Sequence, residues 1–178
     1  MAQGYDYIAI AQHQNDSTET VLLNLVRGTG LAGLGGIPPK RDRVIRPLLF
    51  LNGEEVRTAV EQQGLAYRDD ESNFSTKYAR NKIRLEVIPR LKELNPGLER
   101  TFAENIIRFS ETYEVLQQYI EQLRDQLFEQ RDPGEWTIAI DRLRALHPQQ
   151  LLLYELFKPF HFSESVLRDL AGALPAGT

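Results

Sequence analysis

The run Ala11-Gln12-His13-Gln14-Asn15-Asp16-Ser17-Thr18-Glu19-Thr20 stands where an apolar stretch, residues 7–11, gives way to a helical pattern. Because the stretch is apolar on both faces, we predict that it forms a buried strand of a parallel sheet. Ligands bind at the carboxyl ends of such strands, and the backbone N–H groups that begin the next helix attract anions. His13, Asp16 and Glu19 are spaced three residues apart in this run, which makes it a candidate active-site edge.

A helix is predicted over residues 18–27, with its N-cap at Asp16 and its end at Gly28. Glu19 follows Asp16 by three residues, which is the spacing of a capping box. The buried stripe of this helix is predicted to consist of Val21, Leu22 and Leu25. From the residues alone, Asp16 and Glu19 can be helix-capping groups without a chemical role, and His13 can be a hydrogen-bonded loop histidine.

Further short elements extend the strand–helix alternation. Strands are predicted over residues 43–50 and 65–68, and between them a helix capped by Asn52 and ending at Gly64. The glycine-rich residues 28–39 follow a helix and lack the spacing of a phosphate-binding loop, so we predict a connecting loop. Strand, helix, strand, helix, strand is the pattern of an α/β domain.

The second half of the chain has a helical pattern. Apolar residues recur at alternating steps of four and three, which predicts one long helix that packs in its own bundle or pairs in a homodimer. These residues are Phe102, Ile106, Phe109, Tyr113, Leu116, Ile120, Leu123 and Leu127. Residues 132–135 are predicted to turn the chain, and shorter helices follow. We therefore predict an α/β domain over residues 1–95 followed by an all-α domain over residues 96–178, mostly helical overall.

Composition limits the classes of protein. The 178 residues contain no cysteine, which excludes a disulfide framework or a thiolate metal site, and no apolar run long enough to span a membrane. A cytoplasmic location is the default. The net charge is −4, yet basic residues gather in 40–46 and 77–92, a pattern of either polyanion contacts or a solvated charged face. His147 and His161 lack polar neighbours of the kind found around His13, and we interpret them as structural.

A second polar group of residues occupies 69–84. Acidic residues open this segment, and Arg80, Lys82 and Arg84 close it at a predicted helix start. Arg80 and Arg84 are one helical turn apart and would project in the same direction, an arrangement that suits phosphate or carboxylate. The same arginines could instead pair with the acids that open the segment, which are Asp69, Asp70 and Glu71.

Taken together, five segments resemble the tRNA(Ile)-lysidine synthetase family in order and spacing across residues 7–96. They are His13-x-x-Asp16-x-x-Glu19-Thr20, Arg27-Gly28-Thr29-Gly30-Leu31-x-Gly33-Leu34, Arg46-Pro47-Leu48-Leu49, Asp70-x-Ser72-Asn73, and Arg80-Asn81-x-Ile83-Arg84 with Ile88-Pro89. The resemblance implies the C-terminal half of a PP-loop parallel-sheet domain, of the adenine nucleotide alpha hydrolase-like kind. It also implies that the helical remainder is a tRNA-binding domain.

The resemblance further implies a reaction. Members of this family use ATP to adenylylate C2 of the wobble cytidine in a tRNA(Ile) with a CAU anticodon, and the ε-amine of L-lysine then displaces AMP. ATP and Mg²⁺ are the implied cofactors. His13, Asp16 and Arg80 would be catalytic, with Asp16 also near the metal and Glu19 at the cofactor. The residues expected to bind RNA are Arg46, Lys82 and Arg84.

One family motif does not occur. The family holds the ATP phosphates with a Ser-Gly-Gly-x-Asp-Ser loop, and no Ser-Gly-Gly is present among these 178 residues. We expect this chain to be the central part of a longer protein that alone binds ATP poorly and makes no lysidine. Two other classes remain as alternatives. One is a PP-loop tRNA thiolase, disfavoured by the lack of cysteine, and the other is a non-catalytic helical interaction module.

Overall fold

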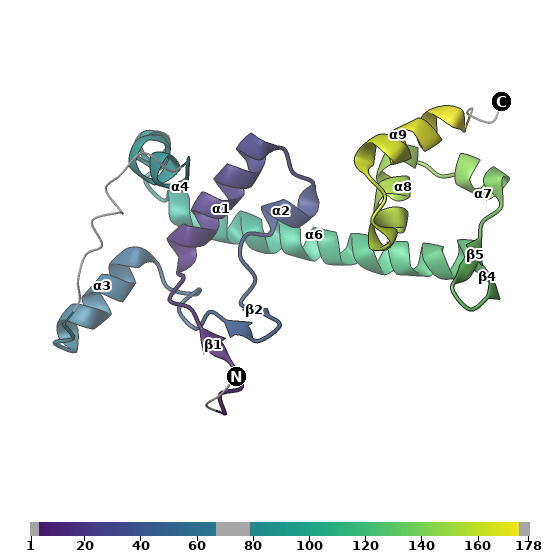
Figure 1. Cartoon of the computed structure of the whole chain (residues 1–178). Helices are drawn as coiled ribbons and strands as arrows, with labels where there is room; N and C mark the ends of the chain where they lie inside the picture. Colours follow the sequence, from purple (N-terminus) through teal and green to yellow (C-terminus); the bar gives the residue numbers. More distant parts are fainter. Residues whose placement is uncertain (1–3, 67–78, 175–178) are drawn as a thin grey trace. The chain divides into compact units, whose positions relative to one another are not determined.

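The computed structural model describes residues 4–66 and 79–174 (Figure 1). The chain divides into two compact units, residues 1–113 and 114–178. As expected, the described part is mostly helical, with α/β elements first and helices afterwards. The division between the compact units lies inside a long helix, and the predicted domain boundary between residues 95 and 96 stays a prediction.

A small sheet of three strands opens the first unit. Strand β1 (Ile8–Ala9) pairs in parallel with β3 (Val44–Ile45), which pairs antiparallel with β2 (Lys40–Arg41). The predicted strand over residues 7–11 is therefore shorter than expected, and it is not buried: Ile8 is 51% exposed. Within the described residues β1 is an edge strand that pairs with β3 alone, and both of its residues are exposed. The strand predicted over residues 43–50 is also shorter in the structure, where it consists of β3 alone.

Helix α1 (Gln14–Arg27) begins four residues earlier than predicted. Its N-cap is His13 rather than Asp16, which lies in the first turn, where its carboxylate accepts a hydrogen bond from the backbone N–H of His13 (2.9 Å). The prediction that Asp16 and Glu19 form a capping box is therefore wrong. The prediction that Leu25 belongs to the buried stripe of this helix is also wrong, because Leu25 is half exposed. It lines an apolar hollow beside α2 (Leu31–Leu34).

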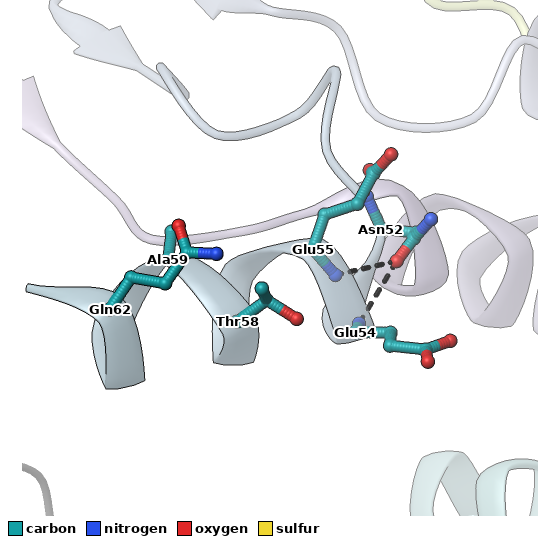
Figure 2. A pocket seen from close by; sticks show the side chains of 6 residues that line it. All are labelled: Asn52, Glu54, Glu55, Thr58, Ala59 and Gln62. Carbon is teal, nitrogen blue, oxygen red and sulfur yellow. Dashed lines mark hydrogen bonds between the residues drawn. The ribbon is translucent and has the colours of Figure 1, made fainter.

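Helix α3 (Gly53–Gln62) has the predicted cap. The Asn52 side chain accepts hydrogen bonds from the backbone N–H groups of Glu54 and Glu55, each at 2.9 Å (Figure 2). The shallow hollow of about 370 Å³ in Figure 2 is lined by Asn52 and by side chains of α3 between Glu54 and Gln62. Residues 65 and 66 are irregular rather than a strand, and the remainder of that predicted strand lies outside the described residues.

A continuous helical run follows, from α4 (Ala79–Lys82) through the π-helical turn η2 (Ile83–Val87) to α5 (Ile88–Leu94). Pro89 lies near the start of α5 and has no N–H to donate to the preceding turn, which explains why a wider turn replaces regular α-helix there. The core of the first unit gathers around this run. Its buried members are Ile83, Ile88 and Leu98, against which Leu22, Leu23, Leu91 and Phe102 pack.

Helix α6 (Leu98–Leu127) confirms the predicted long helix, and a turn at the expected residues 132–135 follows it. This turn joins β4 (Glu129–Asp132) to β5 (Glu135–Thr137), a hairpin that an all-α prediction did not include. The remaining elements of the second unit are α7 (Ile140–Arg144), α8 (Gln149–Phe157), the 3-10 turn η3 (Lys158–Phe160) and α9 (Glu164–Ala173). Within the described residues, no helix combines the length and apolar character needed to cross a membrane.

The heptad residues of α6 contribute to the core of the second unit. Ile120 and Leu127 are buried there against α7 and α8, which is how a helix packed in its own bundle behaves. The homodimer through this face stays a prediction. The buried members of this core are Ile120, Leu127, Leu143, Leu146, Leu152, Leu153, Leu156 and Leu174.

We predict that Leu153→Ala destabilises the second unit by about 2–5 kcal/mol, because it removes a side chain that is 0% exposed and leaves a cavity. Leu151→Ala is the matched control on the same helix, since Leu151 is 41% exposed and should cost less than about 1 kcal/mol. Urea unfolding of the two variants measures both values. Equal losses for the two variants would contradict this description of the core.

Candidate active site

The candidate site begins at the N-terminus of α1, where His13 and Asp16 are held together. His13 has extended backbone angles (φ −124°, ψ −177°) and donates its backbone N–H to Asp16 Oδ2. The His13 ring nitrogen Nε2 lies 3.7 Å from the same carboxylate oxygen, and Nδ1 is buried with no hydrogen-bond partner among residues 4–66 and 79–174. The first turn of α1 therefore places an imidazole and a carboxylate side by side.

Glu19 lies one turn further along α1, and its side chain is 2% exposed. Two arginines from the α4–η2 run bind it. Arg80 Nε donates to Glu19 Oε2 at 2.8 Å, and Arg84 Nε donates to Glu19 Oε1 at 2.6 Å. Arg84 Nη2 also donates to Glu19 Oε2 at 3.0 Å, which makes the Arg84–Glu19 pair bidentate. The buried carboxylate is thus satisfied on both oxygens.

Asp16 joins the same network. Its Oδ1 accepts from Arg80 Nη2 at 3.1 Å and from Arg84 Nη2 at 3.4 Å. Arg80 Nη2 also donates to the backbone carbonyl of Asp16 at 3.1 Å. We call Asp16, Glu19, Arg80 and Arg84 the carboxylate–arginine network.

The spacing of the two arginines explains how both reach α1. Residues four apart on a helix lie on one face, and Arg80 and Arg84 indeed point to the same pair of carboxylates. The prediction that they project in one direction is confirmed. The acids suggested as their alternative partners, residues 69–71, lie outside the described residues.

The network balances its formal charges, with two carboxylates against two guanidinium groups. The hydrogen bond from Arg84 to Glu19 raises the pKa of Arg84 above its ordinary value, against the opposing effect of burial. Arg84 therefore stays charged throughout the physiological pH range. The side chains of Arg80 and Arg84 keep 36% and 34% of their surface exposed, so the network has a buried side at Glu19 and an open side at the arginines.

Two further residues of the opening run position the site, and sequence reasoning missed them. Asn15 Oδ1 accepts from the backbone N–H of Gly53 at 2.8 Å, and Asn15 Nδ2 donates to Glu99 Oε1 at 3.3 Å. Asn15 thereby connects the first turns of α1, α3 and α6. Gln12 accepts a hydrogen bond from Arg46 Nε at 2.6 Å. The hydrogen-bond partners of Asn15 and Gln12 are 34 to 84 residues away along the chain, and no sequence pattern predicts such pairs.

The other expected site residues are placed apart from the network. Arg46 is half-buried, and besides its bond to Gln12 it donates Nη1 to the carbonyl of Pro38 at 2.8 Å. Lys82 is exposed and lies 4.0 Å from Glu86 on its own helical run. The structure thus brings together five of the seven expected residues. The predicted RNA-binding roles of Arg46, Lys82 and Arg84, and the cofactor role of Glu19, stay predictions.

The residues at the site do not fit a Mg²⁺ ion in this arrangement. Across the described ranges, 4–66 and 79–174, no group of three or more histidine, aspartate or glutamate side chains could hold a metal. Both oxygens of Asp16 already accept hydrogen bonds, and two guanidinium groups face them. A divalent cation favours several oxygen ligands free of competing cations. The expectation that Asp16 binds metal therefore stays a prediction without support from this geometry.

Comparison with protein families gives the class of the chain. Residues 1–91 match the model of the PP-loop domain, and residues 130–178 match the model of the TilS substrate binding domain. Because the first match covers half of the chain, the chain belongs to the PP-loop domain family.

The similarity then extends to particular proteins. The chain is 37% identical over 166 residues to the tRNA(Ile)-lysidine synthase of Parabacteroides distasonis, and 33% identical over 171 residues to that of Bacteroides thetaiotaomicron. These alignments cover 93% and 96% of this chain but 37% and 39% of the relatives. A third relative, the tRNA(Ile)-lysidine synthase of Pseudothermotoga lettingae, is 43% identical over 101 residues, which is 57% of this chain and 23% of the relative. The chain thus spans well under half the length of these relatives.

We predict that Glu19→Gln destabilises the first unit by about 1–3 kcal/mol. Removing one member of a buried ion pair costs about 3–5 kcal/mol, and the partial exposure of both arginines reduces that cost. In a double-mutant cycle with Arg84→Gln, the free energies of unfolding should be non-additive by more than about 0.5 kcal/mol. Lys82→Gln serves as the control, since its ion pair is exposed and should contribute little. Additive effects of Glu19→Gln and Arg84→Gln would show that the pair is not formed.

Proposed function

We propose that this chain forms part of a tRNA(Ile)-lysidine synthase, an ATP-dependent ligase that joins L-lysine to C2 of the wobble cytidine of tRNA(Ile) through an adenylylated intermediate. Its substrates would be ATP, L-lysine and a tRNA with a CAU anticodon. The reaction would take place in the cytoplasm. The whole reaction is a proposal for this chain, since the chain spans 37% of the Parabacteroides relative.

One observation carries the proposal. The motif residues Asp16 and Glu19 are separated from Arg80 and Arg84 by more than sixty positions, and the structure joins all four in one network beside His13. Surface ion pairs seldom involve a carboxylate that is 2% exposed and bound by two arginines. Such an arrangement suits a site whose charged groups must be held in fixed positions.

Each side chain then has a proposed role. Arg80 stabilises the negative charge that develops on the reacting nucleotide, and Asp16 and Glu19 hold its guanidinium in place for that purpose. His13 keeps about a quarter of its side chain exposed, and it can act as the general base that accepts the proton of the attacking lysine amine. Asp16 orients this imidazole through the turn that they share.

The ATP phosphates require backbone donors beyond those described above. Because no Ser-Gly-Gly occurs in the 178 residues, we propose that the 178-residue chain binds ATP weakly and forms no lysidine by itself. The proposed activity therefore needs to be tested with the chain joined to the segments that its relatives possess.

The test is a chimera in which this chain replaces the aligned segment of the Parabacteroides distasonis enzyme. We expect the chimera to convert the wobble cytidine to lysidine in the presence of ATP and lysine. Arg80→Ala and Asp16→Asn should each lower kcat/KM by about 100-fold or more, which is the scale expected when a transition-state charge partner is lost. Mass spectrometry of digested tRNA measures the product.

Arg108→Ala is the control for this assay, because Arg108 carries the same charge in the same unit and pairs with Glu104 on an exposed helix face. It should leave kcat/KM unchanged. Full activity of Arg80→Ala would refute the catalytic role of Arg80, and a folded chimera without any lysidine formation would contradict the proposed function.

A further inference from the structure

The hairpin formed by β2 and β3 carries three cations and one carboxylate, that of Asp42 in its turn, and so has a net positive charge. Lys40, Arg41 and Arg43 are all exposed, and none of them forms an ion pair with a carboxylate of residues 4–66 or 79–174. Two other exposed arginines of the chain are paired. Arg90 pairs with Glu93 at 2.7 Å and Arg144 with Asp141 at 3.0 Å. The hairpin therefore holds three cations against the single carboxylate of Asp42, and none of the three is in an ion pair within the described residues.

The backbone of the hairpin spreads these cations around its tip. Lys40 is paired with Ile45 and Arg41 with Val44, which leaves Asp42 and Arg43 as the turn. Asp42 adopts a left-handed conformation (φ 53°) that a tight turn requires. Because neighbouring side chains of a strand point to opposite faces, Lys40 and Arg41 project to the two sides of the hairpin. Cations thus lie on both faces and at the turn.

An aromatic side chain accompanies the charge. Tyr7 precedes β1 and is half exposed, and Lys40 Nζ lies 4.8 Å from the centre of its ring and 3.4 Å from its hydroxyl oxygen. The backbone N–H of Ile8 donates to the carbonyl of Arg43 at 2.8 Å, which keeps Tyr7 beside the hairpin. Exposed aromatic rings among cations are the composition of surfaces that bind single-stranded nucleic acid, where bases stack on the rings.

We propose that the tip of the β2–β3 hairpin, together with Tyr7, binds RNA: the cations contact backbone phosphates and the ring of Tyr7 stacks on a base. This inference rests on the proposed function for the identity of the RNA as tRNA. Arg46 has a structural role in this surface, because its hydrogen bonds to Gln12 and to the carbonyl of Pro38 hold the base of the hairpin. The exposed cations are those of Lys40, Arg41 and Arg43, and Asp42 adds one exposed carboxylate between them.

The topology places this surface away from the candidate active site. Strand β1 runs parallel to β3 and leads to His13, so the turn at Asp42 and Arg43 lies at the opposite end of these strands. The hairpin therefore contacts RNA that is remote from the reacting base. Binding energy from such remote contacts positions a large substrate without taking part in the chemistry.

The experiment is a titration of fluorescent tRNA(Ile) transcript with the 178-residue chain at several salt concentrations. Each phosphate contact contributes about 0.7–0.9 to the slope of log K against log salt concentration. Lys40→Gln/Arg41→Gln/Arg43→Gln should therefore lower this slope by about 2–3 and weaken binding at least 10-fold at moderate salt. The matched control, Arg90→Gln/Arg108→Gln/Arg144→Gln, removes the same charge from paired positions and should change the slope by less than about 1.

Tyr7 is tested separately. Tyr7→Ala should weaken binding several-fold with little change in the salt slope, whereas Tyr7→Phe should bind as tightly as the unaltered chain because it keeps the ring. Circular dichroism of each variant serves as the check that it is folded. Because these side chains are exposed, no loss of structure is expected.

The outcomes separate the two proposals. The RNA-binding surface of the hairpin would be overturned if the hairpin and control triple variants lost equal RNA affinity, or if the unaltered chain showed no salt-dependent RNA binding. In either case, lysidine formation by the chimera would still support the proposed function. Conversely, hairpin-dependent binding of tRNA and of poly(U) alike, with an inactive chimera, would support the RNA surface and contradict the proposed function.

Discussion

The buried carboxylate of Glu19 is the constraint on which the first unit depends. A carboxylate that is 2% exposed cannot remain ionised without partners, and the chain supplies Arg80 and Arg84 from a segment more than sixty residues away. Satisfying Glu19 therefore fixes the position of α1 relative to the α4–η2 run. Asp16, one turn earlier, accepts a hydrogen bond from Arg80 and so joins the same network. His13 is held beside it because its backbone N–H donates to the Asp16 carboxylate.

Charge is organised differently in the two polar regions of this unit. In the carboxylate–arginine network, two acids and two arginines neutralise one another, and their geometry is fixed by several hydrogen bonds. At the β2–β3 hairpin, Lys40, Arg41 and Arg43 are exposed without carboxylate partners among the described residues. The first arrangement suits positioned chemistry, and the second suits salt-dependent attraction of a polyanion. Both arrangements agree with the proposed function.

Local signals in the sequence predicted local structure well. The heptad residues predicted α6, Asn52 predicted the start of α3, and the four-residue spacing of Arg80 and Arg84 predicted their common direction. Asp16 was harder to interpret, because the same residue type caps helices and occupies their first turn, and the difference depends on where the helix begins. The hairpin of β4 and β5 was missed because Glu129, Gln130 and Arg131 show no apolar alternation.

What the sequence could not reveal is which distant residues meet. Glu19 has the spacing of a capping partner for Asp16, yet it binds arginines 61 and 65 positions away. The strand at residues 7–11 looked buried because its composition is apolar, although burial depends on which neighbours cover it. The resemblance to a family compensated for part of this gap, since it implied that His13, Asp16, Glu19 and Arg80 belong to one site, whereas it placed Arg84 among the residues expected to bind RNA.

The carboxylate–arginine network is tested by nuclear magnetic resonance of the arginine side chains in the isotope-labelled chain. If the network exists as described, the Nε–H protons of Arg80 and Arg84 exchange slowly with water and show couplings across hydrogen bonds to the Glu19 carboxyl group. The exposed Arg108 provides the reference for fast exchange. Exchange of the Arg80 and Arg84 protons as fast as that of Arg108, with no coupling to Glu19, would show that the carboxylate–arginine network is not formed.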